Sequence, residues 1–200
     1  MRTLLSAGAL ASVAALGLAL ATAPATQAAE NEFRPQLERL MAEQVTPWLS
    51  DDTVVAAVKA QNTEHADLDA AAIESLDQQW RREAEAGGGP LIERVMATPL
   101  SAYLGEKKAA MEGLVSEMFV MDNRGLNVGQ SDVTSDYWQG DEDKWQKTFQ
   151  AGPDALFVDA VEFDDSSEAF LSQVSRTLVD PETGEPIGAI TVGVNVENLF

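Results

Sequence analysis

The sequence predicts an α+β fold in which amino-terminal helices pack on an antiparallel sheet of about five strands. Apolar residues recur every three or four positions up to about residue 112, which is helical spacing. From residue 113 onward they alternate with polar residues, which is strand spacing. Helices followed by strands favour separate layers over βαβ winding, which would interleave the two kinds of element. We therefore expect one continuous domain over residues 29–200, with a helical half at 29–112 and a sheet half at 113–200.

The helical half divides at capping residues, glycines and prolines. A first apolar stripe runs over Phe33–Trp48, and Asp51 can cap the helix that follows. A third helix ends at the three glycines that precede Pro90. Pro90 suits the first turn of the next helix, where its missing N–H is tolerated, and Pro99 separates that helix from a last one.

The sheet half begins with a hairpin. Strand-like segments at 118–121 and 126–130 flank Asp-Asn-Arg-Gly, a strong turn sequence. A short helix is expected over Ser135–Phe149, because its aromatic residues recur at helical offsets. Three further strands are predicted at 155–163, 170–179 and 187–196, and the last two flank a loop rich in turn residues.

The amino terminus resembles an export signal. Residues 1–28 combine Arg2, an uncharged stretch rich in Ala, Leu and Gly, and small residues before a cut after Ala28. Retention as a membrane anchor is the alternative, and cleavage is favoured because Ala and Gly partition weakly into a bilayer and no basic cluster follows. The mature chain is expected in the periplasm, without direct membrane insertion.

Composition excludes several functions. Thirty-three acids face thirteen Lys and Arg, giving a net charge of -20, and nucleic acids and anionic membranes would repel such a chain. The chain has no Cys, which removes disulfides and thiol catalysis. Its one histidine, His65, excludes sites that need two imidazoles and is expected at the surface between helices. We expect neither a cofactor nor enzymatic activity.

The densest group of candidate binding residues lies between Asp132 and Glu168, where eleven acids and two lysines give a local charge of -9. Aromatic rings beside carboxylates suit a pocket that clamps a cationic or apolar ligand. The alternative is a solvated acidic surface with its rings turned into the core. The candidates in this group are Asp136, Tyr137, Trp138, Asp143 and Trp145.

Strand alternation adds candidates from the last two strands. Ile190, Val192, Val194 and Val196 share one face, which should be core, while Thr191, Gly193 and Asn195 share the other. A sheet with one small-polar face can use that face to line a ligand cavity or expose it to water. The candidates on this face are Gln173, Ser175 and Asn195.

The order of elements resembles the Cache (PAS-like) sensor domains of bacterial periplasmic receptors. The resemblance is carried by the hairpin Met118–Val128, the segment Thr134–Glu142 with Trp145, and the strands from Val174 to Val196. It covers about eighty residues. It implies a PAS-like sheet of about five strands with a ligand pocket on one face.

Family positions carried over by this resemblance imply an unusual pocket. Amino-acid-binding members place an Arg two residues before the helix Trp, to hold the ligand carboxylate. If Trp145 is that Trp, Asp143 stands at the Arg position. The family's strand aromatic falls at Glu162, the acid that follows it at Asp164, and the acid of the last strand at Asn195. The resemblance thus implies a negative pocket suited to an amine, a cation or a neutral polar molecule.

The function implied is a periplasmic small-molecule sensor module without its own output domain, since the chain ends four residues after Val196. Such a module would signal through a partner, such as a membrane receptor or histidine kinase. One alternative is a ligand-free structural or interaction protein that docks on such a receptor. Another is a calcium-binding module, because Asp141–Asp143 supplies oxygen ligands, although the alternating ligand pattern of a calcium loop is missing.

Overall fold

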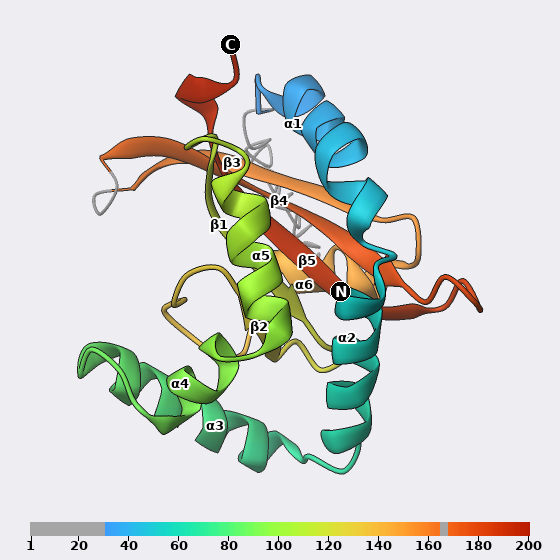
Figure 1. Ribbon diagram of the computed structural model, residues 1–200, viewed down its shortest axis with the longest axis vertical. Helices are drawn as coiled ribbons and strands as arrows, with labels where there is room; N and C mark the ends of the chain where they lie inside the picture. Colours follow the sequence, from blue (N-terminus) through green and yellow to red (C-terminus); the bar gives the residue numbers. More distant parts are fainter. Residues whose placement is uncertain (1–30, 165–167) are drawn as a thin grey trace, which may run out of the picture.

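A five-stranded antiparallel sheet organises the computed structural model, which describes residues 31–164 and 168–200 (Figure 1). The strands are β1 (Val115–Met121), β2 (Asn127–Gln130), β3 (Leu156–Asp164), β4 (Ala169–Val179) and β5 (Pro186–Asn195). Their order across the sheet is β2-β1-β5-β4-β3, so the last strand along the chain lies at the centre. The predicted α+β class is confirmed. The predicted signal segment, residues 1–28, lies outside the described residues.

Six α-helices accompany the sheet in the described part of the chain. They are α1 (Arg34–Leu40), α2 (Asp52–Glu64), α3 (Ala70–Glu85), α4 (Pro90–Met96), α5 (Pro99–Ala109) and α6 (Asp143–Gln146). The expected cap at Asp51 is present, because its side chain accepts a hydrogen bond from the Thr53 N–H. The expected stripe at 33–48 is α1 followed by a π-helical and a 3-10 turn, since Pro47 cannot donate to an α-helical bond.

Helices α1, α2 and α5 cover one face of the sheet (Figure 1). Ile190, Val192 and Val194 of β5 pack there with Val174 and Leu178 of β4, as strand alternation predicted. A second apolar cluster lies between α3 and α4 and includes Trp80 and Tyr137. The two helical groups therefore bury separate surfaces.

The opposite face of the sheet is partly covered by α6 and the 3-10 turn Phe149–Ala151. The helix expected over 135–149 is therefore reduced to these two short pieces. Residues 137–139 instead run beside the β1–β2 turn, where the Asn127 N–H donates to the Tyr137 carbonyl and the Gln139 N–H donates to the Gly125 carbonyl. Trp138 forms a β-bridge with Leu126, and this pairing prevents helical hydrogen bonding there.

The expectation of a surface position for His65 is wrong. His65 is 6% exposed, and its Nδ1 lies 2.9 Å from Oδ2 of Asp122, which is fully buried. The other oxygen of Asp122 accepts the N–H groups of Arg124 and Leu126 in the β1–β2 turn. The end of α2 is thus attached to this turn, a long-range contact that local sequence spacing does not reveal.

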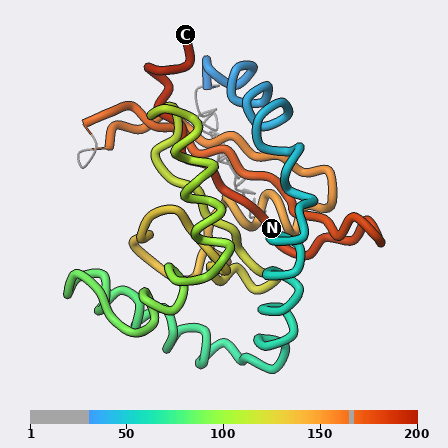
Figure 2. Tube along the Cα trace, viewed as in Figure 1, coloured from blue at the N-terminus to red at the C-terminus, as the bar shows by residue number. Residues whose placement is uncertain are grey.

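Both ends of the described chain lie near one another, where the central strand β5 ends (Figure 2). The ring centres of Phe33 and Phe200 are 6.1 Å apart there. None of the helices in the described residues is long and apolar enough to cross a bilayer.

Candidate functional site

Three residues on neighbouring strands form the floor of the candidate site, on the sheet face opposite α1, α2 and α5. Glu117 of β1 and Gln173 of β4 both stand across from Gly193 of β5. Gln173 Nε2 donates to Glu117 Oε1 over 3.0 Å. A Cβ at Gly193 would lie 2.8 Å from Glu117 Cγ, so the absence of a side chain leaves room for this cross-strand bond.

A cavity of about 500 Å³ opens over this floor. One wall comes from α6 and the residue before it, through Lys144 and Glu142, and another comes from residues 159–164 of β3. Leu171 completes the floor on β4. Cavities of this size bind small organic molecules in other proteins.

The cavity is strongly negative. Lys144 is the only basic residue among its described lining residues, and its Nζ lies 2.8 Å from Glu142 and 5.6 Å from the centre of the Phe119 ring. Burial raises the pKa of Glu117, and the hydrogen bond from Gln173 opposes that rise. The lining acids are Glu117, Glu142, Asp159, Glu162 and Asp164.

Three of the predicted ligand-binding residues are brought together here. Glu162 and Asp164 of β3 and Gln173 of β4 all line the cavity. Ser175 shares their sheet face, but it is fully buried further along β4, where its hydroxyl lies 2.8 Å from that of Thr191. Ser175 therefore supports the sheet below the covering segment and does not line the cavity.

The structure places three other predicted residues around the cavity without bringing them to its surface. Trp145 is 7% exposed and stacks on Phe149, with ring centres 5.1 Å apart. Asp143 is exposed and pairs with Lys147 over 2.7 Å. Asn195, at the end of β5, accepts a hydrogen bond from the Glu197 N–H and caps the turn that follows.

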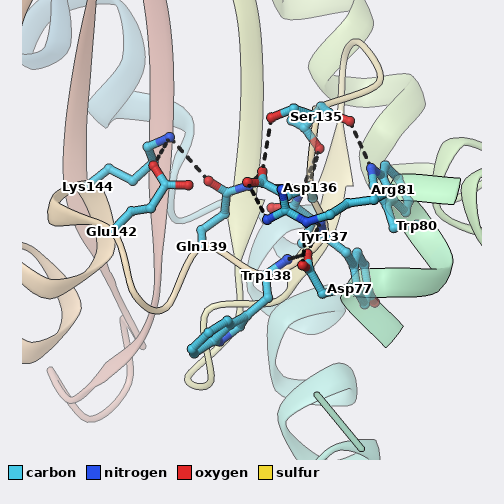
Figure 3. Close-up of polar contacts among 12 residues, drawn as sticks. Asp77, Trp80, Arg81, Ser135, Asp136, Tyr137, Trp138, Gln139, Glu142 and Lys144 are labelled. Atoms are coloured by element: carbon cyan, nitrogen blue, oxygen red, sulfur yellow. Dashed lines mark hydrogen bonds and ion pairs between the residues drawn. The ribbon is translucent and has the colours of Figure 1, made fainter. Parts of the chain in front are cut away.

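The remaining predicted residues, Asp136, Tyr137 and Trp138, lie against α3 (Figure 3). The Tyr137 ring stacks on Trp80 with centres 5.3 Å apart. Asp77 Oδ1 accepts the backbone N–H groups of Tyr137 at 2.9 Å and Trp138 at 3.0 Å. None of the three residues lines the cavity; they join the sheet half of the chain to the helical half.

A chain of polar contacts connects the cavity wall to α3, as Figure 3 shows. Lys144 Nζ donates to Gln139 Oε1 over 3.2 Å, and Gln139 Nε2 donates to Asp136. Asp136 Oδ2 lies 3.2 Å from Arg81 Nη2, and Arg81 Nε donates to Asp77 Oδ2 over 2.6 Å. Each link joins charged or amide groups, so a shift of Lys144 would disturb the next contact.

Sequence reasoning missed Glu117 and Lys144 as site residues. The predicted first strand began at Met118, one residue too late to include Glu117, although Glu117, Phe119 and Met121 alternate on one face. Lys144 was treated only as a minority charge among acids. Within residues 31–164 and 168–200, no group of three or more acids and histidines is arranged to hold a metal ion.

No protein-family model matches the chain, and no curated protein sequence matches it. Among solved structures it is similar to the sensor domain of the V. cholerae histidine kinase DctB, at 13% identity and a TM-score of 0.44 over 84% of this chain and 56% of that one. It is also similar to the sensory domain of the Campylobacter jejuni chemoreceptor Tlp3, at 14% identity and a TM-score of 0.40 over 83% and 64%.

A further similar structure is the ligand-binding domain of the Pseudomonas aeruginosa amino acid chemoreceptor PctC in complex with GABA, at 14% identity and a TM-score of 0.36 over 81% and 62%. The chain thus spans less than two thirds of the length of these three structures. All three are sensor or ligand-binding domains, the class of module that the sequence resembles.

Proposed function

We propose that this chain is a periplasmic sensor module that binds a small organic cation in the cavity above Glu117, Gln173 and Gly193. The observation that carries the proposal is the cavity itself, where five acids and one lysine line about 500 Å³ above a polar sheet face. A ligand with one or two amino groups would neutralise part of that charge. A neutral polar molecule is the second ligand class that the site could accept, through the Gln173 amide.

The cavity offers a cationic ligand three kinds of contact. Glu117 provides a half-buried carboxylate, whose attraction for a cation is stronger than that of an exposed one because water screens it less. Gln173 provides an amide that already orients this carboxylate. Phe163 provides a half-exposed ring at the cavity wall, and a ring face attracts ammonium groups.

The polar chain from Lys144 to Asp77 gives such a module a route for its response. A bound cation competes with the Lys144 ammonium for the acids of the cavity and displaces it from Glu142 or Gln139. The change then reaches α3 through Asp136 and Arg81. A membrane receptor or histidine kinase that contacts α3 could read this change, and the predicted export signal would place the module where such receptors present their sensor domains.

The proposal is tested by calorimetry and thermal shift on the mature protein, with putrescine and choline as cationic probes and glutarate as an anionic comparison. We expect putrescine to bind and to raise the melting temperature, while glutarate leaves both unchanged. The Glu117→Gln variant keeps the shape of the side chain and should weaken putrescine binding at least about tenfold. Glu185→Gln, which removes an equal charge from the exposed β4–β5 loop, serves as the matched control.

Equal loss of binding in Glu117→Gln and Glu185→Gln would show that only the overall charge attracts the probe. Absence of binding by every amine tested would contradict the cationic ligand class. Loss of binding in Glu117→Gln alone would instead show that the probe binds at a specific site that includes Glu117.

A ligand-free interaction protein is the second candidate function, favoured by one observation. Phe163 and Phe170 are 52% and 47% exposed at the β3–β4 hairpin, with ring centres 5.2 Å apart. If a stable complex with a membrane receptor is recovered from envelope extracts, survives Glu117→Gln and is lost in Phe170→Ser, this second function replaces the first.

A further inference from the structure

A second cavity, also of about 500 Å³, lies further along β4 and takes no part in the proposed cation site. It is bounded by the turn after α1, by the loop before β3 and by the β4–β5 hairpin. Its apolar surface comes from Leu49, Pro153, Leu178 and Pro181. Arg176 is the basic residue of this lining, so the two cavities differ in the charge that they present.

Arg176 is unusual among the basic residues of this acidic chain. It is half-buried, yet among the described residues its guanidinium has no ion pair, hydrogen bond or aromatic ring as partner. Six other basic side chains in the described part of the chain do pair with acids: Arg34, Lys59, Arg81, Lys108, Lys144 and Lys147. Five more in that part have no acid partner, but three of them are exposed, a fourth lies over two aromatic rings and the fifth donates to a backbone carbonyl: Arg39, Arg82, Arg94, Lys107 and Arg124. Arg176 differs from all of these because it is half-buried and has no such partner among the described residues.

The position of Arg176 in β4 explains why it forms no ion pair with an acid of the described residues. Arg176 stands between Val174 and Leu178 on the core face, opposite Leu156 of β3 and Ile190 of β5. Its cross-strand neighbours are therefore apolar. A guanidinium in such surroundings presents five N–H donors that only water can satisfy, and a carboxylate can accept two of them at once.

We propose that this cavity is a second binding site, which takes a small monocarboxylate with an apolar body. The carboxylate pairs with Arg176, and the apolar body packs on Leu49, Leu178 and Pro153. Asp154 lines the same cavity and repels additional negative charge, so a single carboxylate fits better than a dicarboxylate or a phosphate. The site is independent of the proposed cation site, because the two cavities share no lining residue.

The test uses sodium benzoate as the probe and benzamide as its neutral counterpart, titrated into the isotopically labelled mature protein. We expect benzoate, and not benzamide, to shift the NMR signal of the Arg176 side-chain N–H in the unaltered protein. Calorimetry should show at least about tenfold weaker benzoate binding in Arg176→Gln, because the paired charge-assisted bonds are lost. Arg82→Gln, which removes an exposed charge on α3, should bind benzoate as the unaltered protein does.

Two further variants separate the sites and report on the surrounding charge. Asp154→Asn should bind benzoate more tightly, and Glu117→Gln should leave benzoate binding unchanged even though it weakens putrescine binding. If the Arg176 signal does not shift at about 10 mM benzoate, the proposal is overturned, because a dissociation constant above that concentration is too weak for a specific binding site. Equal weakening in Arg176→Gln and Arg82→Gln overturns it as well, since that outcome assigns the effect to net charge alone.

Discussion

Asp77 joins α3 to the segment that carries Tyr137 and Trp138, and its removal should cost the fold substantial stability. Its side chain is 8% exposed and accepts two backbone N–H groups and the Arg81 guanidinium. Each hydrogen bond to a buried charged acceptor contributes about 1.5 to 3 kcal/mol. The ion pair adds less than about 1 kcal/mol, because the Arg81 side chain is 51% exposed. We expect Asp77→Ala to lower the free energy of unfolding by about 3 to 5 kcal/mol.

Urea unfolding followed by tryptophan fluorescence measures this loss, since Trp80 lies one turn from Asp77 on α3. Asp77→Asn retains an oxygen for the two N–H groups and loses only the charge, so it should cost about 1 to 2 kcal/mol. Glu74→Ala removes an exposed acid from the same helix and should cost less than about 0.5 kcal/mol. If Asp77→Ala costs no more than Glu74→Ala, water satisfies the two N–H groups, and Asp77 does not anchor the segment.

Three other variants test the sheet and its turn. Burial raises the pKa of Glu117, so its contribution to stability is greatest at low pH and is lost as the pH rises through that raised pKa. Unfolding curves from about pH 4 to pH 8 should therefore show that the free energy of unfolding of Glu117→Gln increases relative to that of the unaltered protein as the pH rises. A difference that stays constant with pH would contradict this. Gly193→Ala places a Cβ 2.6 Å from Ser116 Oγ, so it should lower the free energy of unfolding by about 1 to 3 kcal/mol in chemical unfolding and should weaken putrescine binding. Unchanged stability and binding would show that the strands around Gly193 can move apart to accept the methyl group. Asp122→Ala should lower the free energy of unfolding by about 3 to 5 kcal/mol in the same assay. This loss should exceed that of His65→Ala, because Asp122→Ala also leaves the Arg124 and Leu126 N–H groups unpaired. Equal losses would show that these two hydrogen bonds contribute little.

The strands were the most predictable part of the molecule. The strands predicted at 170–179 and 187–196 have bounds within one or two residues of those of β4 and β5. The prediction succeeded because each strand has one face in the core and the turns that flank it carry strong local signals. The assignment of Ile190, Val192 and Val194 to the core follows from the same period. Local periodicity is enough to predict a strand and its core residues wherever one face of the strand is buried and the other is polar.

The candidate site could be predicted only in part. Gln173 and Gly193 were assigned to the polar face, but their meeting with Glu117 depends on the register between β1 and β5, which the sequence does not encode locally. Tyr137 and Trp138 were expected in a helix, and their backbone instead bonds to Asp77, sixty residues away along the chain. A hydrogen bond between one carboxylate and a backbone segment so far along the chain leaves no periodic pattern in the sequence, so it could not be predicted.

The central place of β5 has a consequence for the order of folding. β1 pairs with β2, β3 pairs with β4, and β4 pairs with β5, each through a short connection. β1 and β5, by contrast, pair across most of the sheet half of the chain. Closing such a long loop is slow, so we expect the two local units to form first and to join last along the seam between β1 and β5. Glu117 and Gln173 belong to different units and bond across that seam. A ligand held between them would therefore bind only the fully joined sheet and would slow its unfolding, with no effect on the formation of either unit.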